Sequence, residues 1–197
     1  MPDLGHLVAQ WGYLGIVVIV LLGNVGVPVP EETALIVAGY LVWQGHLRLS
    51  IVLVVAVVSA IAGDNLGYEL GRRFGQAAVE RVAQWAAVDA DRMGSMRHFV
   101  SRYGPLAVFG GRFIPGLRFL AGPLAGAAGL GFRSFFVANA LGAAVFVPYG
   151  VGLGYAIGYG LGPYIADMRL AERAVAIGAF ICIAGYVGRI WWSRRRR

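Results

Sequence analysis

Long apolar runs without a polar stripe dominate this sequence of 197 residues. Two of them, roughly 50 to 71 and 134 to 160, reach the ~20 residues that a helix needs to cross a bilayer core. A water-soluble surface helix would carry polar residues on one face with a period of about 3.6 residues, and neither run does. Only 14% of the residues are charged, against roughly 25% in a soluble domain. We therefore predict an all-α membrane protein.

The cationic residues indicate which side of the membrane each segment faces. All seventeen are arginines, and they cluster in residues 72 to 102 and in the tail after a third apolar segment, 174 to 192. That segment ends in Trp191 and Trp192, as is typical of a spanning helix at the membrane interface. The positive-inside rule places both arginine clusters, and hence the C-terminus, in the cytoplasm. The rule also explains the net charge of +7, so we expect no nucleic-acid partner.

Proline interrupts two further apolar stretches. The stretch 13 to 43 is broken at Pro28 and Pro30, and the stretch 104 to 130 is broken at Pro115. Proline removes a backbone donor and clashes with the preceding turn, so each stretch should form two short helices that meet at a bend. Each half is too short to span the membrane. We predict two re-entrant hairpins, which enter the membrane, turn at the proline and leave on the same side.

The sequence repeats itself at an offset of 87 residues. Between residues 23 and 75 this offset gives thirteen identities without a gap, where a composition so rich in Gly and Ala would give about five by chance. The identities include Gly23 with Gly110, Pro28 with Pro115, Gly39 with Gly126, and Leu66-Gly67-Tyr68 with Leu153-Gly154-Tyr155. Each half is therefore a broken hairpin followed by one spanning helix.

These elements define one membrane domain over residues 1–197. Repeat 1 covers about 13–75, an amphipathic cytoplasmic linker covers 76–102, repeat 2 covers about 103–162, and the additional C-terminal helix covers 174–192. One spanning helix per repeat is an odd number of crossings, so the second repeat must be inverted relative to the first. The two hairpin tips would then approach each other near the midplane of the membrane, where inverted-repeat transporters place their binding sites.

Five charged residues are embedded in these apolar segments. They are Glu31 and Glu32 after the first bend, Asp64 inside the first spanning helix, and Arg112 and Arg118 on either side of the second bend. A charge near the centre of a spanning helix costs ~2.5 to 3.5 kcal/mol, so it needs a partner or a water-filled cavity. Under the offset of 87, Glu31 corresponds to Arg118. The hairpin tips thus carry opposite charges at equivalent positions.

Two arginines beside a broken helix favour an anion site. Arginine stays protonated and its planar fork matches phosphate oxygens, while the N-termini of broken helices add positive dipole ends. Carboxylic acids in low-dielectric surroundings can bind protons near neutral pH, so Glu32 and Asp64 are candidates for proton coupling. Two simpler interpretations stay open. In the first, the charges form only a structural lock between the hairpins; in the second, Asp64 is a buried polar residue hydrogen-bonded to Asn65 and Tyr68.

Other site types receive less support from the sequence. His6, His46 and His98 lie outside the hairpin tips, no two are at metal-ligand spacing, and no Ser or Cys lies near a base. We therefore expect no enzymatic activity, no metal and no cofactor. Glycines recur at every fourth residue from Gly63 to Gly75 and from Gly150 to Gly162, which is typical of helix-packing faces. Those faces could serve internal packing or a homodimer.

Three motifs in order carry a family resemblance. They are residues 23–33 (GNVGVPVPEET), 63–75 (GDNLGYELGRRFG) and 111–118 (GRFIPGLR), followed by Ala125-Gly126, Asn139, Gly142 and Gly154-Tyr155. Together they resemble the DedA family of SNARE-associated (VTT-domain) proteins over about residues 12 to 160. The resemblance implies a multi-pass protein of the bacterial inner membrane that moves phospholipids or the polyprenyl-phosphate carrier of cell-wall synthesis. It also implies a dependence on protons or sodium ions.

Residue roles carried over from the family fall on the embedded charges. Its acids correspond to Glu32 and Asp64 and its arginines to Arg112 and Arg118, and its Pro-x-Pro-Gly/Ser-Glu pattern favours Glu32 over Glu31. This chain departs from the family pattern at three positions. Gly23 stands where many members have Glu, Glu31 replaces a small residue, and Phe146 replaces a common Trp. The choice between Glu31 and Glu32 as the essential acid therefore stays open.

The resulting hypothesis is a flippase that returns undecaprenyl phosphate across the inner membrane. Arg112 and Arg118 would bind the lipid phosphate and the acids would couple protons, with Asn65, Tyr68 and Asn139 in supporting positions. A transporter or scramblase of phosphatidylethanolamine is the first alternative. A membrane scaffold without transport activity is the second.

Overall fold

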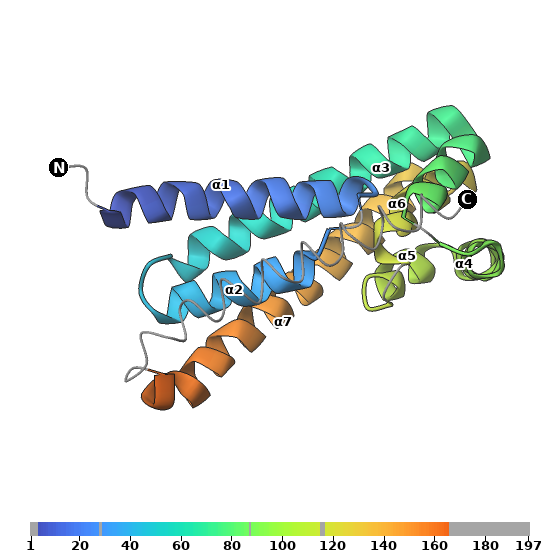
Figure 1. The fold of residues 1–197 in the computed structure, drawn as a ribbon. Coiled ribbons are helices and arrows are strands. Elements are labelled where there is room, and N and C mark those ends of the chain that lie inside the picture. The colour runs from blue at the N-terminus through green and yellow to red at the C-terminus, as the bar shows by residue number, and fades with distance from the viewer. Residues whose placement is uncertain (1–3, 28, 87, 115–116, 166–197) are drawn as a thin grey trace, which may run out of the picture.

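The computed structural model describes residues 4–27, 29–86, 88–114 and 117–165, which are helical apart from short connections (Figure 1). The helices are α1 Leu4–Val25, α2 Glu31–Trp43, α3 Leu49–Trp85, α4 Ala90–Tyr103, α5 Pro105–Gly111, α6 Arg118–Ala127 and α7 Phe132–Ile165. No strand occurs within these ranges, so the predicted all-α class is confirmed. The predicted C-terminal helix at 174 to 192 and the bend residues Pro28 and Pro115 lie outside the described residues.

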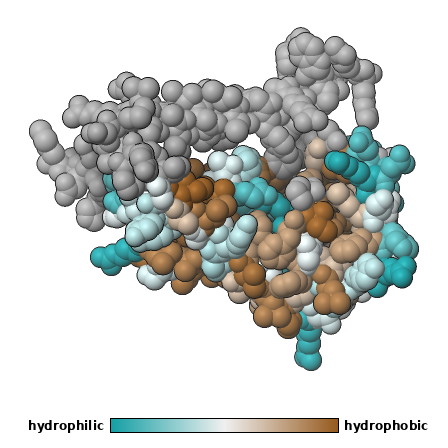
Figure 2. Space-filling model, turned by 90° about the horizontal axis from the view of Figure 1, so that it is seen from below, coloured by the Kyte–Doolittle hydropathy of each residue, from teal (hydrophilic) through white to brown (hydrophobic). Residues whose placement is uncertain are grey.

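Two helices are long and apolar enough to cross a membrane. They are Leu49–Ala77 within α3 and Phe132–Gly160 within α7, with 29 residues each, and they contain the predicted spans. Large apolar side chains such as Val54 and Val145 are exposed along both helices. Figure 2 shows such residues over much of one face of the molecule, with hydrophilic residues mostly towards its periphery. Lipid is the solvent that suits this surface.

Helices α1 and α2 run in opposite directions alongside each other and form a helical hairpin (Figure 1). The chain turns near Gly26, whose φ of 121° is strained for any residue with a side chain. Helix α1 begins at Leu4 instead of near residue 13, because no proline interrupts residues 4 to 12. The apolar part of α1, Trp11–Val25, is nevertheless shorter than a membrane span.

The second half repeats this order of elements with shorter helices. Helix α5 has 7 residues and begins with Pro105, a residue favoured at the first helical position. Helix α6 has 10 residues and contains Pro123. The long helix α7 then follows, as α3 follows α2 in the first half.

The linker at 76 to 102, predicted as one amphipathic helix, contains the end of α3 and the separate helix α4. Helix α3 continues to Trp85 across a kink at Gly75, where the φ of 61° favours glycine, and α4 follows as a separate helix. The apolar side of this region faces protein, because Val79, Met93 and Val100 are buried in one cluster with residues of α5 and α6. The linker is thus part of the packed structure of the second half.

The two halves exchange their hairpin helices. Helix α6 packs along α3, and α2 packs along α7. Both contacts depend on glycine: a Cβ at Gly126 would collide with the carbonyl oxygen of Tyr68, and a Cβ at Gly39 would collide with that of Val151. Gly39 and Gly126 are equivalent under the offset of 87. The first residues of α2 and α6, Glu31 and Arg118, are both buried within this packing.

Candidate functional site

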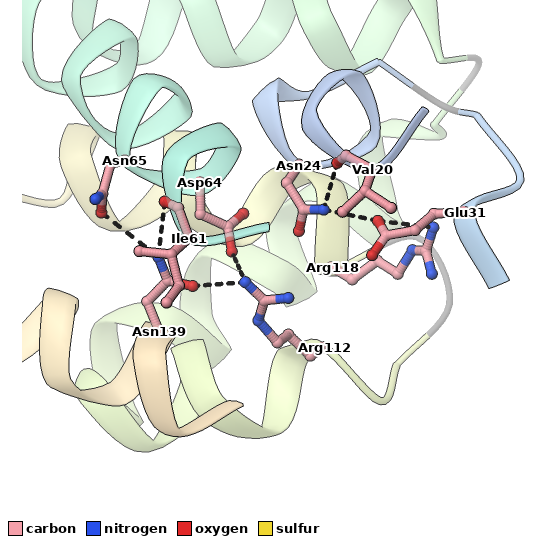
Figure 3. Close-up of polar contacts among 9 residues, drawn as sticks. All are labelled: Val20, Asn24, Glu31, Ile61, Asp64, Asn65, Arg112, Arg118 and Asn139. Carbon is pink, nitrogen blue, oxygen red and sulfur yellow. Dashed lines mark hydrogen bonds and ion pairs between the residues drawn. The ribbon is translucent and has the colours of Figure 1, made fainter. Parts of the chain in front are cut away.

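A buried ion pair links α3 to the residue that follows α5 (Figure 3). Asp64 lies on α3 and Arg112 directly follows α5, and their side chains are only 4% and 3% exposed. The guanidinium of Arg112 donates to Asp64 Oδ2 and also to Asn139 Oδ1 on α7, at 2.6 Å. Arg112 therefore ties three helical segments together in the interior.

Asn139 supports this pair from α7. Its side-chain nitrogen lies 3.4 Å from the carbonyl oxygen of Ile61 and 3.5 Å from Asn65 Oδ1 (Figure 3). These contacts orient the amide so that its oxygen faces the guanidinium of Arg112. Asn65 thus reaches the cluster only through Asn139. The alternative in which Asn65 and Tyr68 hydrogen-bond Asp64 is not what these contacts show.

Tyr68 has a different role. Its hydroxyl donates to the backbone carbonyl of Leu130, and its ring stacks on Phe135 with the centroids 4.4 Å apart. Tyr68 therefore packs α3 against the start of α7 and lies outside the charged cluster.

A second charged group joins the starts of α2 and α6. Arg118 Nη2 lies 3.5 Å from Glu31 Oε2, and Nη1 pairs with Glu32 Oε1. The guanidinium also lies over the ring of Phe146, 5.8 Å from its centroid. The side chain of Glu31 is 2% exposed, whereas that of Glu32 is 50% exposed. One arginine therefore holds both candidate acids, one buried and one open to its surroundings.

The pairing of Glu31 with Arg118 connects the two repeats. These residues are equivalent under the offset of 87, and each is the first residue of its helix. A carboxylate suits the positive end of the α2 dipole, but a guanidinium at the start of α6 adds charge of the same sign to the dipole there. Glu31 and Glu32 offset this unfavourable placement of Arg118 by pairing with its guanidinium.

Asn24 and Gly23, to which the sequence motifs assign no role, position Glu31. Asn24 on α1 donates to Glu31 Oε2 and to the carbonyl oxygen of Val20, each at 2.7 Å (Figure 3). Gly23 leaves the space that the carboxylate occupies, because a Cβ there would lie 2.9 Å from Glu31 Oε2. Asn24 could have been predicted as a site residue from its position within an apolar helix, since a buried amide needs hydrogen-bond partners.

We expect Gly23→Ala to weaken the binding of Glu31 within the cluster. The added methyl group displaces the carboxylate from Asn24 and Arg118, which should lower the free energy of unfolding by about 1–3 kcal/mol. Thermal unfolding of the purified protein in detergent measures this loss. Gly15→Ala in the same helix is the matched control, because nothing lies within 4 Å of a Cβ there. Equal stability of the two variants would contradict the placement of Glu31.

The cluster keeps unused hydrogen-bonding capacity. Among the described residues, Glu31 Oε1, Asp64 Oδ1, Arg112 Nε and Arg118 Nη1 are buried without a hydrogen-bond partner. Arg118 Nη1 lies close to Glu32 but without hydrogen-bond geometry. Each such group costs roughly 1–3 kcal/mol, and a site that only locked two hairpins together would gain by satisfying them. The unused donor Arg112 Nε fits a site that receives another anion.

The charges of the cluster do not cancel. Three carboxylates (Glu31, Glu32 and Asp64) face two guanidiniums (Arg112 and Arg118), which gives −3 + 2 = −1 when all are ionised. One proton makes the cluster neutral, and a second makes it positive. The affinity of this site for an anion should therefore depend on the protons that it carries.

Comparisons with known proteins agree with a membrane location. A family profile described as the VTT domain matches residues 29–156, which include all five charged residues of the cluster. The chain is 36% identical over 158 residues to the uncharacterized membrane protein slr0232 of Synechocystis, covering 80% of this chain and 72% of that protein. It is 29% identical over 196 residues to the inner membrane protein YohD of Escherichia coli, covering 98% and 95% of the two chains. No solved structure matches it.

Proposed function

This chain belongs to the VTT-domain (DedA) family of membrane proteins, and from that premise we propose that it translocates a phosphate-bearing lipid across the bacterial inner membrane, with undecaprenyl phosphate as the substrate. The observation that carries the proposal is the pair of buried arginines, Arg112 and Arg118, each held by carboxylates from the other half of the chain. Two guanidiniums match the geometry and charge of a phosphate group.

An inverted repeat of two re-entrant hairpins gives such a cluster a transport role. Support for this arrangement comes from the exchange of α2 and α6 between the long helices α7 and α3. The equivalent glycines Gly39 and Gly126 at those contacts add to it. Inverted repeats move by rocking one half against the other around a central site. Each half here would carry its own part of the charged cluster, so rocking would open the cluster first to one side and then to the other.

We propose that lipid phosphate competes with the carboxylates for the arginines. In the structure both arginines are occupied by Glu31, Glu32 and Asp64. Protonation of one acid frees the guanidinium nitrogen that it holds, and this nitrogen can then bind a phosphate oxygen; return of the acid to its charged form expels the phosphate. This exchange couples proton uptake to lipid binding through the carboxylates and guanidiniums of the cluster alone. A sodium ion that neutralised a carboxylate would act in the same sense.

The exchange predicts that Glu31→Gln strengthens the binding of lipid phosphate at alkaline pH. The amide imitates the protonated acid, so Arg118 should keep only Glu32 as a charged partner where the wild type holds two carboxylates. We expect affinity for undecaprenyl phosphate in nanodiscs to rise roughly tenfold, the effect of ~1.4 kcal/mol. The wild type should gain affinity as the pH falls towards neutral, and the variant should gain less. Glu69→Gln, which removes an exposed partner of Arg73, is the matched control. Weaker binding by Glu31→Gln would contradict the exchange.

A second candidate substrate is phosphatidylethanolamine. The excess carboxylate of the cluster, and the half-exposed Glu32 in particular, could pair with its ammonium group while an arginine binds its phosphate. A competition assay in proteoliposomes separates the two substrates. If phosphatidylethanolamine inhibits transport of labelled undecaprenyl phosphate as strongly as the unlabelled carrier does, the headgroup assignment to polyprenyl phosphate is wrong.

A further inference from the structure

An apolar groove lies on the outer side of the helix pair that carries the buried cluster. It has a volume of about 680 Å³ and lies between α5 and the start of α7. Its apolar wall includes Leu106, Phe109, Val137 and Leu141. Three of these side chains are more than half exposed: Leu106 is 72% exposed, and Val137 and Leu141 are each 57% exposed. The volume falls within the range of small-molecule sites.

One end of the groove is polar. Arg133 and Ser134 line it there, at the beginning of the apolar span Phe132–Gly160. Arg133 is exposed and forms no ion pair with any other described residue. A cation at the end of a membrane span lies at the level of lipid headgroups. From Arg133 to Leu141 the groove follows α7 for eight residues, which is about 12 Å of helix.

The groove leads towards the cluster along the contact between α5 and α7. Phe109 lines the groove, and Arg112 follows it by one helical turn; Asn139 follows the groove residue Ala138. The two segments approach closely at Gly142, where a Cβ would lie 2.9 Å from Arg112 Cδ. The outer groove and the inner charged site thus share their walls.

We propose that this groove is a docking site for a phosphate-bearing lipid, with the headgroup phosphate on Arg133 and Ser134 and the first part of the hydrocarbon chain along Val137 and Leu141. The proposal rests on the proposed function, since it makes the groove the place where a substrate lipid binds beside the transport site. Lipid chains are as apolar as the groove, so the chain alone gives little preference over bulk lipid. Selectivity must come from the charge of Arg133.

Photocrosslinking in the full-length protein tests the docking site independently of transport. A benzophenone amino acid replaces Leu141 in the groove or, as a matched control, the exposed Leu153 of the same helix. Each protein is placed in phosphatidylcholine nanodiscs that contain a minor share of undecaprenyl phosphate. After irradiation, mass spectrometry measures the adducts. We expect the adduct with undecaprenyl phosphate to form at position 141 at least ~5-fold more than at position 153, and uncharged polyprenol to show no such preference.

Variants then test the two ends of the groove. Arg133→Gln should reduce the adduct at position 141 by ~5-fold, whereas Arg81→Gln, an exposed arginine outside the groove, should not. Val137→Trp should block it, and Val145→Trp should not. Equal labelling at 141 and 153, equal labelling by polyprenol, or a crosslink to a second copy of the chain would each overturn the proposal. The readout for Arg133→Gln is the amount of adduct and not a transport rate. A negative result would therefore overturn the docking site without contradicting the role of Arg112 and Arg118 in transport.

Discussion

Arg112→Ala is expected to lower the free energy of unfolding by about 3–5 kcal/mol and to abolish transport. The substitution leaves Asp64 buried without its partner and removes the donor to Asn139. An uncompensated charge in the interior costs this much even when the original pair was worth little. Thermal or denaturant unfolding in detergent measures the loss of stability, and a reconstituted transport assay measures the loss of function.

The double variant Arg112→Met with Asp64→Leu separates stability from transport. Well-packed apolar residues often replace a buried ion pair at no cost, so we expect the double variant to recover the stability lost with the pair, less the cost of the unpaired Asn139 Oδ1. If the cluster only holds the hairpins together, function should recover with stability, as the scaffold alternative requires. The proposed function predicts a stable protein that does not transport. Recovery of transport in the double variant would refute the role of Arg112 in binding phosphate.

Gly126→Ala is expected to destabilise the protein by roughly 1–3 kcal/mol or more. Helices α6 and α3 touch through their backbones at this point, because a Cβ at Gly126 would collide with the carbonyl oxygen of Tyr68 and would lie 2.8 Å from the nitrogen of Arg72. Backbone atoms cannot move aside as a flexible side chain can, so the two helices must separate. The melting temperature in detergent reports this effect.

The control for this substitution is expected to change the stability in the opposite direction. Gly152→Ala on α7 meets nothing within 4 Å, and alanine favours a helix over glycine by about 1 kcal/mol, so the variant should be slightly more stable. Gly39→Ala, at the equivalent contact between α2 and α7, should destabilise the protein as Gly126→Ala does. If Gly126→Ala lowered the stability of the protein and Gly39→Ala did not, the two helix contacts would not contribute equally to stability.

Much of the helical architecture follows from the sequence because apolar length and proline are direct signals. The spans 50 to 71 and 134 to 160 lie within α3 and α7, and the charges placed near the bends lie together, buried except for the half-exposed Glu32. The start of α1 at Leu4 was not predicted, because the prediction followed the apolar stretch from residue 13 and the helix continues into more polar residues such as Gln10. The packing of the linker could not be predicted, because amphipathicity does not tell whether an apolar face meets lipid or protein.

The sequence indicates which charged residues belong to the site more readily than it indicates which of them contact each other. The offset of 87 aligns Glu31 with Arg118, and the structure places Arg118 Nη2 3.5 Å from Glu31 Oε2. Which acid each arginine holds depends on how α3, α5 and α7 pack, and the sequence leaves that open. Arg118 in fact contacts both Glu31 and Glu32, while Asn24 and Gly23 shape the place of Glu31 from a third helix. Such contacts across helices leave no periodic pattern in the sequence.

Transport of fluorescent undecaprenyl phosphate in proteoliposomes tests most directly whether these arginines carry a lipid phosphate. We predict that the wild-type protein moves the lipid between leaflets faster than protein-free vesicles do, and faster still with an imposed pH gradient. Arg118→Ala, reconstituted to the same level, should fall to the protein-free rate. A wild-type rate equal to that of empty vesicles, or an Arg118→Ala rate equal to that of the wild type, would contradict the proposed transport.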